Sequence, residues 1–164
     1  MFESQARAVS GVTVLAVGVF DLFHIGHLRY LQYARQQGSA LIVGVMPDRT
    51  AGSLKAKRPV IDQDQRLEIV AGLACVTEAL LMPTATTDTH AAAGWIPGWS
   101  VHHVVAGGGW QGSERWLRLA PLLQMQGIAV SFAPQTEGIS TTDLVARIRA
   151  PLRAAPAVSQ AKQP

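Results

Sequence analysis

The sequence predicts an α/β fold in which one five-stranded parallel sheet has helices on both faces. Short apolar runs rich in β-branched residues alternate with segments whose apolar residues recur at helical spacing. The runs are apolar on both sides, as is typical of strands buried within a parallel sheet. Each strand–helix–strand unit is long enough for a right-handed crossover, which favours the doubly covered sheet.

Five apolar runs fit strands of this kind, and turn residues separate them. They are Val12–Phe20, Ala40–Met46, Thr77–Met82, Val101–Ala106 and Ile128–Phe132. No repeat and no second domain is visible between them. We therefore expect one domain over residues 12–149, and a disordered tail over residues 150–164, where Ala, Pro, Gln and Ser dominate.

Helical patterns occupy most of the intervals. The first follows residue 21 and ends at Gly38, which we expect to cap it. Asp62 or Asp64 can cap a second helix that runs to about Leu73, with Leu67, Val70 and Ala71 facing inward.

The intervals after residue 77 have helical patterns too, and the exception is the interval that follows the second predicted strand. We expect a short helix near Thr89–Ala93, a helix from Ser113 to about Gln126, and a last helix after Gly138. The segment Pro47–Pro59, rich in Lys, Arg and Gly, is predicted to be a loop.

Composition excludes several classes of protein. Hydrophobic residues make up 48% and charged residues 15% of the 164, which suits a folded domain rather than a disordered chain. The net charge of +3 comes from the C-terminus, because residues up to Asp143 carry 10 basic and 11 acidic side chains. A nucleic-acid partner is therefore not expected.

The cysteine content and the hydropathy of the sequence indicate the cellular compartment of the protein. The single cysteine, Cys75, excludes an intrachain disulfide and fits a reducing compartment. No apolar run reaches the roughly 18 residues of a membrane-spanning helix, and no secretory leader is visible at the N-terminus. We expect a cytoplasmic protein with no membrane contact.

The strongest candidates for catalytic residues follow the end of the first predicted strand. The string GVFDLFHIGH places His24 and His27 three residues apart at a helix start, with Gly26 between them. Ligands bind at the carboxyl ends of strands in such sheets, and helix N-termini favour anions. Two imidazoles there suit phosphoryl or nucleotidyl transfer. The plainer alternative is a capped helix with two surface histidines.

This string resembles the GxFDxxHxGH signature of the cytidylyltransferase-like nucleotidyltransferases. The letters HIGH also match class I aminoacyl-tRNA synthetases, but the chain has no KMSKS string and is too short for tRNA-binding domains. The resemblance implies a Rossmann-like fold of the HIGH superfamily. It also implies nucleotide contacts along the first loop, from Gly18, Val19, Phe20, Asp21 and Gly26.

Two further stretches resemble the same family, in the same order. KAKRPV followed by Asp64-Gln65-Arg66 is similar to a stretch of glycerol-phosphate cytidylyltransferases and heptose-phosphate adenylyltransferases. GISTT is similar to glycerol-3-phosphate, phosphocholine and phosphoethanolamine cytidylyltransferases. The residues of this last string that the resemblance assigns to the nucleotide are Gly138, Ile139, Ser140, Thr141 and Thr142, together with Gly107 after the fourth strand.

The resemblance implies that an acceptor phosphate displaces pyrophosphate directly from a nucleoside triphosphate. His24 and His27 would stabilise charge on the α-phosphate, while Lys57 and Lys55 would hold the outer phosphates. Arg66 would grip the acceptor phosphate or the triphosphate, unless it is simply an exposed helix arginine. Mg²⁺ would arrive with the nucleotide, since no residue spacing indicates a protein metal site.

Three positions depart from the family pattern. Gln135 replaces an arginine, Gly109 replaces a carboxylate, and the arginine of a dimer segment is missing from 73–78. Trp110 could stack on a base or on the acceptor, or be a core or lid residue. Asp48 could contact the acceptor or ribose, or only begin a turn. A homodimer is still expected, because segment 73–78 is apolar.

Three functions remain open. The first is a CTP-dependent cytidylyltransferase acting on a small phosphorylated alcohol, such as glycerol phosphate, or on a phosphonate, and GISTT favours it. The second is an ATP-dependent adenylyltransferase acting on a sugar phosphate or FMN, favoured by the SLKAKRPV stretch and the glycine doublet. The third is a degenerate nucleotide-binding protein with a regulatory role, to which only the departures point.

Overall fold

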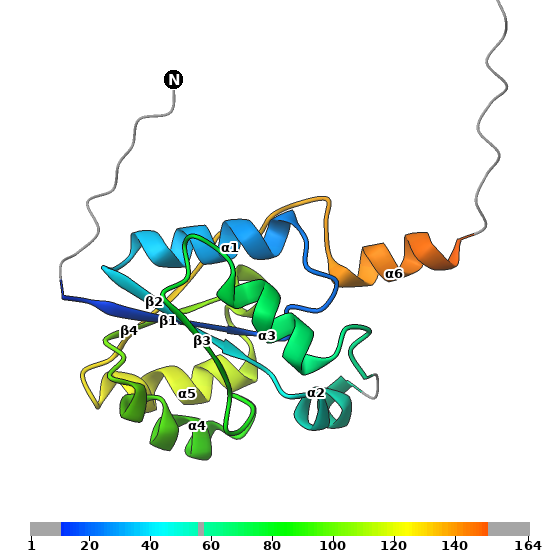
Figure 1. The fold of residues 1–164 in the computed structure, drawn as a ribbon. Helices are drawn as coiled ribbons and strands as arrows, with labels where there is room; N and C mark the ends of the chain where they lie inside the picture. The colour runs from blue at the N-terminus through cyan, green and yellow to red at the C-terminus, as the bar shows by residue number, and fades with distance from the viewer. Residues whose placement is uncertain (1–10, 56–57, 151–164) are drawn as a thin grey trace, which may run out of the picture.

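The computed structural model describes residues 11–55 and 58–150, and its strands form one parallel sheet in the order β3-β2-β1-β4-β5 (Figure 1). The register places Thr13 opposite Ala40, and Val14 opposite His103. The predicted fold class is confirmed. The strands are β1 (Thr13–Gly18), β2 (Ala40–Val45), β3 (Glu78–Leu81), β4 (His103–Ala106) and β5 (Ala129–Phe132).

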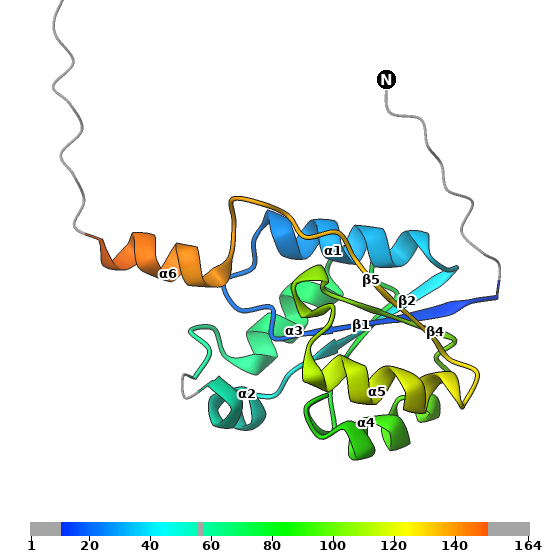
Figure 2. The same cartoon turned by 180° about the vertical axis from the view of Figure 1, so that it is seen from behind.

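Helices cover both faces of the sheet, as Figures 1 and 2 show from opposite sides. One face is covered by α1 (Ile25–Gln36) and α3 (Gln63–Ala71), the other by α4 (Thr89–Trp95) and α5 (Glu114–Gln124). Side chains of β1 alternate between the two cores: Val14 joins the α1 side and Leu15 the α5 side. This alternation follows from the period of two along a strand.

The predicted loop at Pro47–Pro59 is wrong over most of its length, because α2 (Asp48–Lys55) begins there. The Pro47 carbonyl accepts the amides of Thr50 at 3.1 Å and Ala51 at 2.9 Å. Ala51 is 3% exposed and lies in a small core cluster with Met46 and Met82. Burial of Ala51 in this cluster stabilises a short helix in a segment that Lys, Arg and Gly make look like a loop in the sequence.

Smaller differences concern helix ends. The helix near residue 89 extends to Trp95, and short 3₁₀ turns follow at Pro97–Trp99 and Gly108–Trp110. Ala71, expected to face inward, is exposed, whereas Val70 is fully buried. Gly38 does not end α1 in a left-handed conformation; a side chain there would instead strike the Val12 carbonyl.

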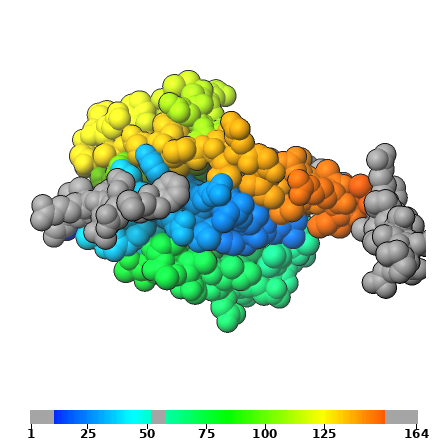
Figure 3. Space-filling model, turned by 90° about the horizontal axis from the view of Figure 1, so that it is seen from above, coloured from blue at the N-terminus to red at the C-terminus, as the bar shows by residue number. Residues whose placement is uncertain are grey.

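Helix α6 (Thr141–Arg149) is the outlying element of the fold. Figure 3 shows it, in orange, extending beyond the blue surface of α1. None of its residues is buried. Its first turn nevertheless joins the body at the edge of the sheet where the functional residues gather. The predicted tail beyond residue 150 lies outside the described residues, and the proposed boundaries of the domain stay a prediction.

Candidate active site

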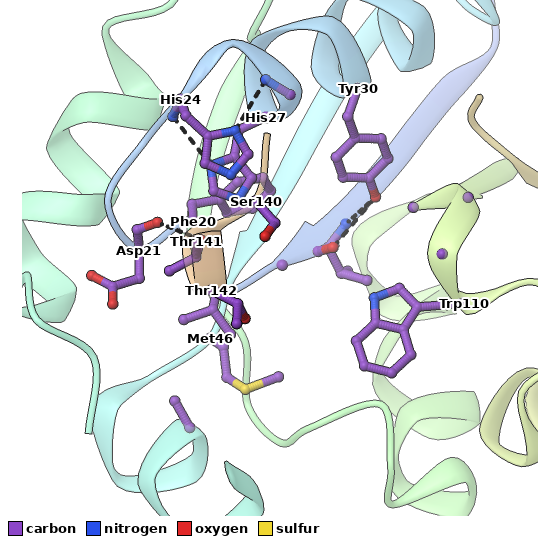
Figure 4. Close-up of a pocket in the computed structure, with 18 of the residues that line it drawn as sticks. Phe20, Asp21, His24, His27, Tyr30, Met46, Trp110, Ser140, Thr141 and Thr142 are labelled. Carbon is purple, nitrogen blue, oxygen red and sulfur yellow. Dashed lines mark hydrogen bonds between the residues drawn. The ribbon is translucent and has the colours of Figure 1, made fainter. Parts of the chain in front are cut away.

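A cleft of about 1410 Å³ opens at the carboxyl ends of the central strands (Figure 4). The loop after β1 forms one part of its lining, the start of α6 another, and the segments after β4 and β5 the rest. β1 and β4 diverge here, and the sheet order reverses between them. A switch point of this kind is where open α/β sheets bind ligands.

Tyr30 holds these two strands together where their ladder ends. Its hydroxyl donates to the Val105 carbonyl at 2.7 Å and accepts from the Val17 amide at 3.1 Å. Burial raises the pKa of the Tyr30 phenol. The hydroxyl thus satisfies backbone groups that the diverging strands leave unpaired, and keeps the floor of the cleft open.

The two predicted histidines begin α1 and cap it reciprocally. Nδ1 of His24 accepts the Gly26 amide at 3.0 Å, and Nδ1 of His27 accepts the His24 amide at 3.4 Å. Both Nδ1 atoms are therefore acceptors, which leaves Nε2 as the N–H donor of each ring. A side chain at Gly26 would come within 2.8 Å of the His24 ring, so this cap needs glycine.

The imidazoles stack on each other with centroids 3.9 Å apart and ring planes 23° apart. His27 also packs against the Phe20 and Phe23 rings, with distances of 5.5 and 5.4 Å between ring centroids. Burial lowers the pKa of His24, so its ring is neutral at pH 7. Two imidazoles held in this way by stacking and by their Nδ1 hydrogen bonds have fixed positions at the start of α1.

The loop that leads into α1 is strained around Asp21. Phe20 and Leu22 adopt φ values of 56° and 46°, a region that residues with side chains rarely enter. The Asp21 carboxylate is buried and accepts the amides of Val60 at 2.9 Å and Ile61 at 3.0 Å. It also accepts the amide of the next residue, Leu22. Asp21 therefore ties this loop to the segment before α3.

The start of α6 lies beside the start of α1, as Figure 4 shows. The Thr141 hydroxyl donates to the Asp21 carbonyl at 3.1 Å, while Ser140 caps the helix by accepting the Asp143 amide at 3.1 Å. Ile139, Ser140, Thr141 and Thr142 all line the cleft, and Gly138 does not. Two helix N-termini therefore meet at one place, a combination that favours an anion.

Arg66 lies elsewhere than the sequence suggested. Its side chain has no exposed surface, so the exposed-arginine alternative is wrong. The guanidinium donates to the carbonyls of Val19, Ile61 and Met46 and to Asp48 Oδ1 at 2.6 Å. It does not line the cleft, and its contacts are those of a structural residue that joins β1, β2 and α3.

Asp48 takes part in the same network and begins a helix rather than a turn. Its carboxylate pairs with Arg66 and also accepts the Gln63 amide at 3.2 Å. Burial alone would raise the pKa of Asp48, but these hydrogen bonds and the charges of Arg66 and Arg58 lower it. The structure therefore gives Asp48 a bracing role and places it in a smaller hollow beside the cleft.

The described structure does not test the predicted roles of Lys55 and Lys57. Lys57 lies outside the described residues, and Lys55 is the last residue of α2. Arg58 lies at the rim of the cleft, 73% exposed, and pairs with Asp62 at 3.3 Å. The nucleotide roles of both lysines stay predictions.

The opposite wall of the cleft contains two of the departures from the family pattern. A side chain on Gly109 would lie 3.8 Å from the Gln135 amide oxygen, so the two altered positions are neighbours in space. A side chain on Gly108 would strike the Ala133 carbonyl, so the backbone can pass this close to the end of β5 only because residue 108 is a glycine. The carboxylate and the arginine are thus missing as a pair.

Trp110 and Arg115 complete this wall. Trp110 is 45% exposed, and the Arg115 guanidinium lies over its ring, 4.1 Å from the centroid. Trp110 is therefore a wall residue, not a core residue. Arg115 was not anticipated, because the string SER at a helix start reads as an ordinary cap and first turn. The aromatic residue five positions earlier was its only signal.

The donor set does not fit a dedicated metal centre. In the described residues, no three His, Cys, Asp or Glu side chains lie close enough to hold a metal ion. Asp21 is the acidic residue beside the histidines, and backbone amides already occupy its carboxylate. No helix of the described ranges is long and apolar enough to cross a bilayer.

Comparison with known proteins agrees with this geometry. The model of the cytidylyltransferase-like family matches residues 15–147. Two proteins described as bifunctional protein HldE are similar to the chain. That of Halorhodospira halophila is 36% identical over 146 residues, covering 88% of this chain and 29% of that protein. That of Trichlorobacter lovleyi is 32% identical over 143 residues, covering 87% and 28%.

The chain spans less than a third of the length of these relatives. Among solved structures, a lipopolysaccharide core biosynthesis protein from Thermoplasma volcanium superposes with a TM-score of 0.64 at 26% identity. That match covers 77% of this chain and 98% of the other. The similarity to it therefore extends over nearly the whole of that protein.

Proposed function

The chain belongs to the cytidylyltransferase-like family of nucleotidyltransferases, and we propose that it transfers the nucleoside monophosphate of a nucleoside triphosphate to a sugar phosphate. One observation carries the proposal: two imidazoles with assigned Nε2 protons lie at a cleft where the N-termini of α1 and α6 meet. Fixed hydrogen-bond donors and helix dipoles suit a group that gains negative charge during the reaction.

The reaction is a displacement at phosphorus. An oxygen of the acceptor phosphate forms a bond to the α-phosphorus, the bond to the bridging oxygen breaks, and pyrophosphate leaves with the electron pair. His24 and His27 donate from Nε2 to oxygens of the α-phosphate and the leaving group. Their protons stay on the rings, so no covalent enzyme intermediate and no net proton transfer is needed.

Other groups have supporting roles in the proposal. Ser140 and Thr142 lie at the start of α6, where hydroxyl and backbone donors can reach phosphate oxygens. Lys55 and Lys57 would neutralise the outer phosphates. Mg²⁺ would be bound by the triphosphate and water, since Asp21 is occupied by backbone amides.

We propose a sugar phosphate acceptor and ATP as the donor. The solved neighbour is described as a lipopolysaccharide core biosynthesis protein, and such cores are built from sugars. The KAKRPV stretch resembles heptose-phosphate adenylyltransferases, and no carboxylate stands at Gly109. A second candidate is cytidylyl transfer to glycerol phosphate, and the string Gly138–Thr142 favours it.

A pyrophosphate-release assay separates these candidates. ATP, CTP, GTP and UTP are each offered with sugar 1-phosphates, glycerol 3-phosphate and FMN in the presence of Mg²⁺, and mass spectrometry identifies the products. Turnover with ATP and a sugar phosphate is expected. Turnover only with CTP and glycerol phosphate supports the second candidate. Nucleotide binding without turnover for any pair contradicts an enzymatic function and favours a regulatory one.

A further inference from the structure

The start of α5 contains buried polar atoms that the protein does not satisfy. Nε of Arg115 and Oγ of Ser113 are both buried without a hydrogen-bond partner, and both residues line the cleft. Ser113 occupies the N-cap position of α5 but makes no side-chain cap bond. Buried polar atoms are rarely left unpaired, so two of them in one cleft wall point to a ligand.

Arg115 is also held in place rather than free to leave the wall. Nη1 donates to the Thr86 hydroxyl at 3.2 Å, and the guanidinium plane lies over the Trp110 ring. Burial lowers the pKa of Arg115, because it removes water from around the charged guanidinium. Nε is the guanidinium nitrogen for which the described structure records no protein acceptor, and the Nε–Nη2 edge of an arginine matches an oxyanion bidentately.

We propose that Arg115 and Ser113 bind the phosphate group of the acceptor substrate, a phosphomonoester, on the wall of the cleft formed by the start of α5. The inference rests on the proposed nucleotidyl transfer, because it names where the second substrate of that reaction lies. In this arrangement the guanidinium fork holds two oxygens of the phosphate. The Ser113 hydroxyl donates to one of them, and a further oxygen is left to attack.

The acceptor is favoured over the nucleotide as the source of this phosphate. The N-termini of α1 and α6, with His24 and Ser140, already provide one place for the phosphates of the nucleotide. Arg115 instead contacts Thr86, which follows β3 on the other side of the cleft. Figure 4 shows Trp110, the platform of Arg115, across the pocket from the two histidines.

Charge gives an independent reason. An acceptor dianion that approaches a triphosphate is repelled unless a cation stands beside it. The cleft lining includes three arginines within the described residues: Arg58, Arg115 and Arg149. Arg58 is paired with two aspartates at the rim, and Arg149 is an exposed residue at the far end of α6. Arg115 is thus the arginine that is both partly buried and lacks an acidic partner.

The test measures phosphate binding directly. Inorganic phosphate is titrated into the protein, followed by ³¹P NMR, with and without a saturating non-hydrolysable nucleotide that occupies the helix N-termini. Wild-type protein is expected to bind phosphate in both conditions. Arg115→Met should weaken binding by about 10- to 100-fold when the nucleotide is present, and Arg115→Lys should recover part of it.

Arg118→Met is the matched control, since Arg118 lies on the same helix, pairs with exposed Glu114 and does not line the cleft. It should bind phosphate like the wild type. With an active substrate pair, Arg115→Met should raise KM for the acceptor and leave KM for the nucleotide unchanged.

Each possible failure has a distinct meaning. Unchanged phosphate affinity in Arg115→Met, or a loss confined to nucleotide affinity, overturns the acceptor subsite. Wild-type protein that binds phosphate through Arg115 but turns over no substrate pair contradicts the proposed function instead. Thermal unfolding of each variant shows that the fold is intact, which keeps a loss of binding interpretable.

Discussion

At the scale of single residues, His24 combines a structural and a chemical role in one ring. Nδ1 caps α1, and Nε2 carries the proton that we assign to phosphate oxygens. Asparagine is a good N-cap but does not reach as far as Nε2. His24→Asn should therefore lower kcat by about 10²- to 10³-fold and leave the melting temperature nearly unchanged. Steady-state kinetics and thermal unfolding test this together.

His24→Ala is the control that separates the two roles. It removes the cap as well as the donor, so it should lose about 1 kcal/mol of stability in addition to activity. Full activity in His24→Asn would contradict the assigned role of Nε2.

The pKa of His24 also predicts how stability varies with pH. Because burial lowers this pKa, the folded protein binds fewer protons at His24 than the unfolded chain does. The stability contributed by the neutral ring is complete above about pH 6.5, the unfolded value, and is lost as pH falls through the lower folded value. Urea denaturation between pH 5 and 8 should show a smaller loss in His24→Asn than in the wild type.

His103 contributes in the same direction, since burial lowers its pKa too. His103 therefore contributes to the pH dependence of stability that remains in His24→Asn, and the difference between the two proteins measures the contribution of His24. Identical slopes in both proteins would contradict the prediction.

At the scale of elements, Arg66 joins three segments through one guanidinium. It bonds carbonyls after β1, after β2 and before α3, and pairs with Asp48 at the start of α2. Removing a buried partner of this kind leaves an uncompensated charge, which costs about 3–5 kcal/mol. Arg66→Met should reduce the free energy of unfolding by that amount in a urea titration.

The double variant Asp48→Asn/Arg66→Met shows whether the pair acts as a unit. Since the two residues are in contact, their effects should be less than additive. A stable Arg66→Met protein that has lost only substrate affinity would restore the phosphate-binding role that the sequence suggested.

At the scale of the whole molecule, nucleotide binding should stabilise the fold. The cleft joins the loop after β1 to α5 and α6, so a ligand held there links elements that are far apart in sequence. With ligand at 100 times Kd, the expected gain is about 2.7 kcal/mol. Thermal shift with the preferred nucleotide measures this. An unchanged melting temperature with the nucleotide at 100 times its Kd would contradict binding to the folded protein alone.

The oligomeric state stays a prediction. It was based on the apolar segment 73–78, yet Leu73, Cys75 and Val76 pack against the protein's own core on the α1 side. Sedimentation velocity at several concentrations would test the expected dimer. The cytoplasmic location likewise stays a prediction.

Local sequence patterns were sufficient to predict the five strands, their alternation with helices, and the positions of the HxGH and GISTT strings. Local patterns are sufficient for these, because β-branched runs and helix caps depend on neighbouring residues. The same local view could not detect α2, whose helix depends on burying Ala51 among Met46 and Met82.

Which polar residues face the cleft and which brace the fold depends on tertiary contacts that the sequence does not reveal. Arg66 and Asp48 look like ligand residues in the sequence, but buried carbonyls and each other satisfy them. Arg115 looks like a surface residue, but it lies in the cleft with an unpaired nitrogen. These roles differ because the role of a charged group depends on the acceptors around it, and segments distant in the sequence supply those acceptors.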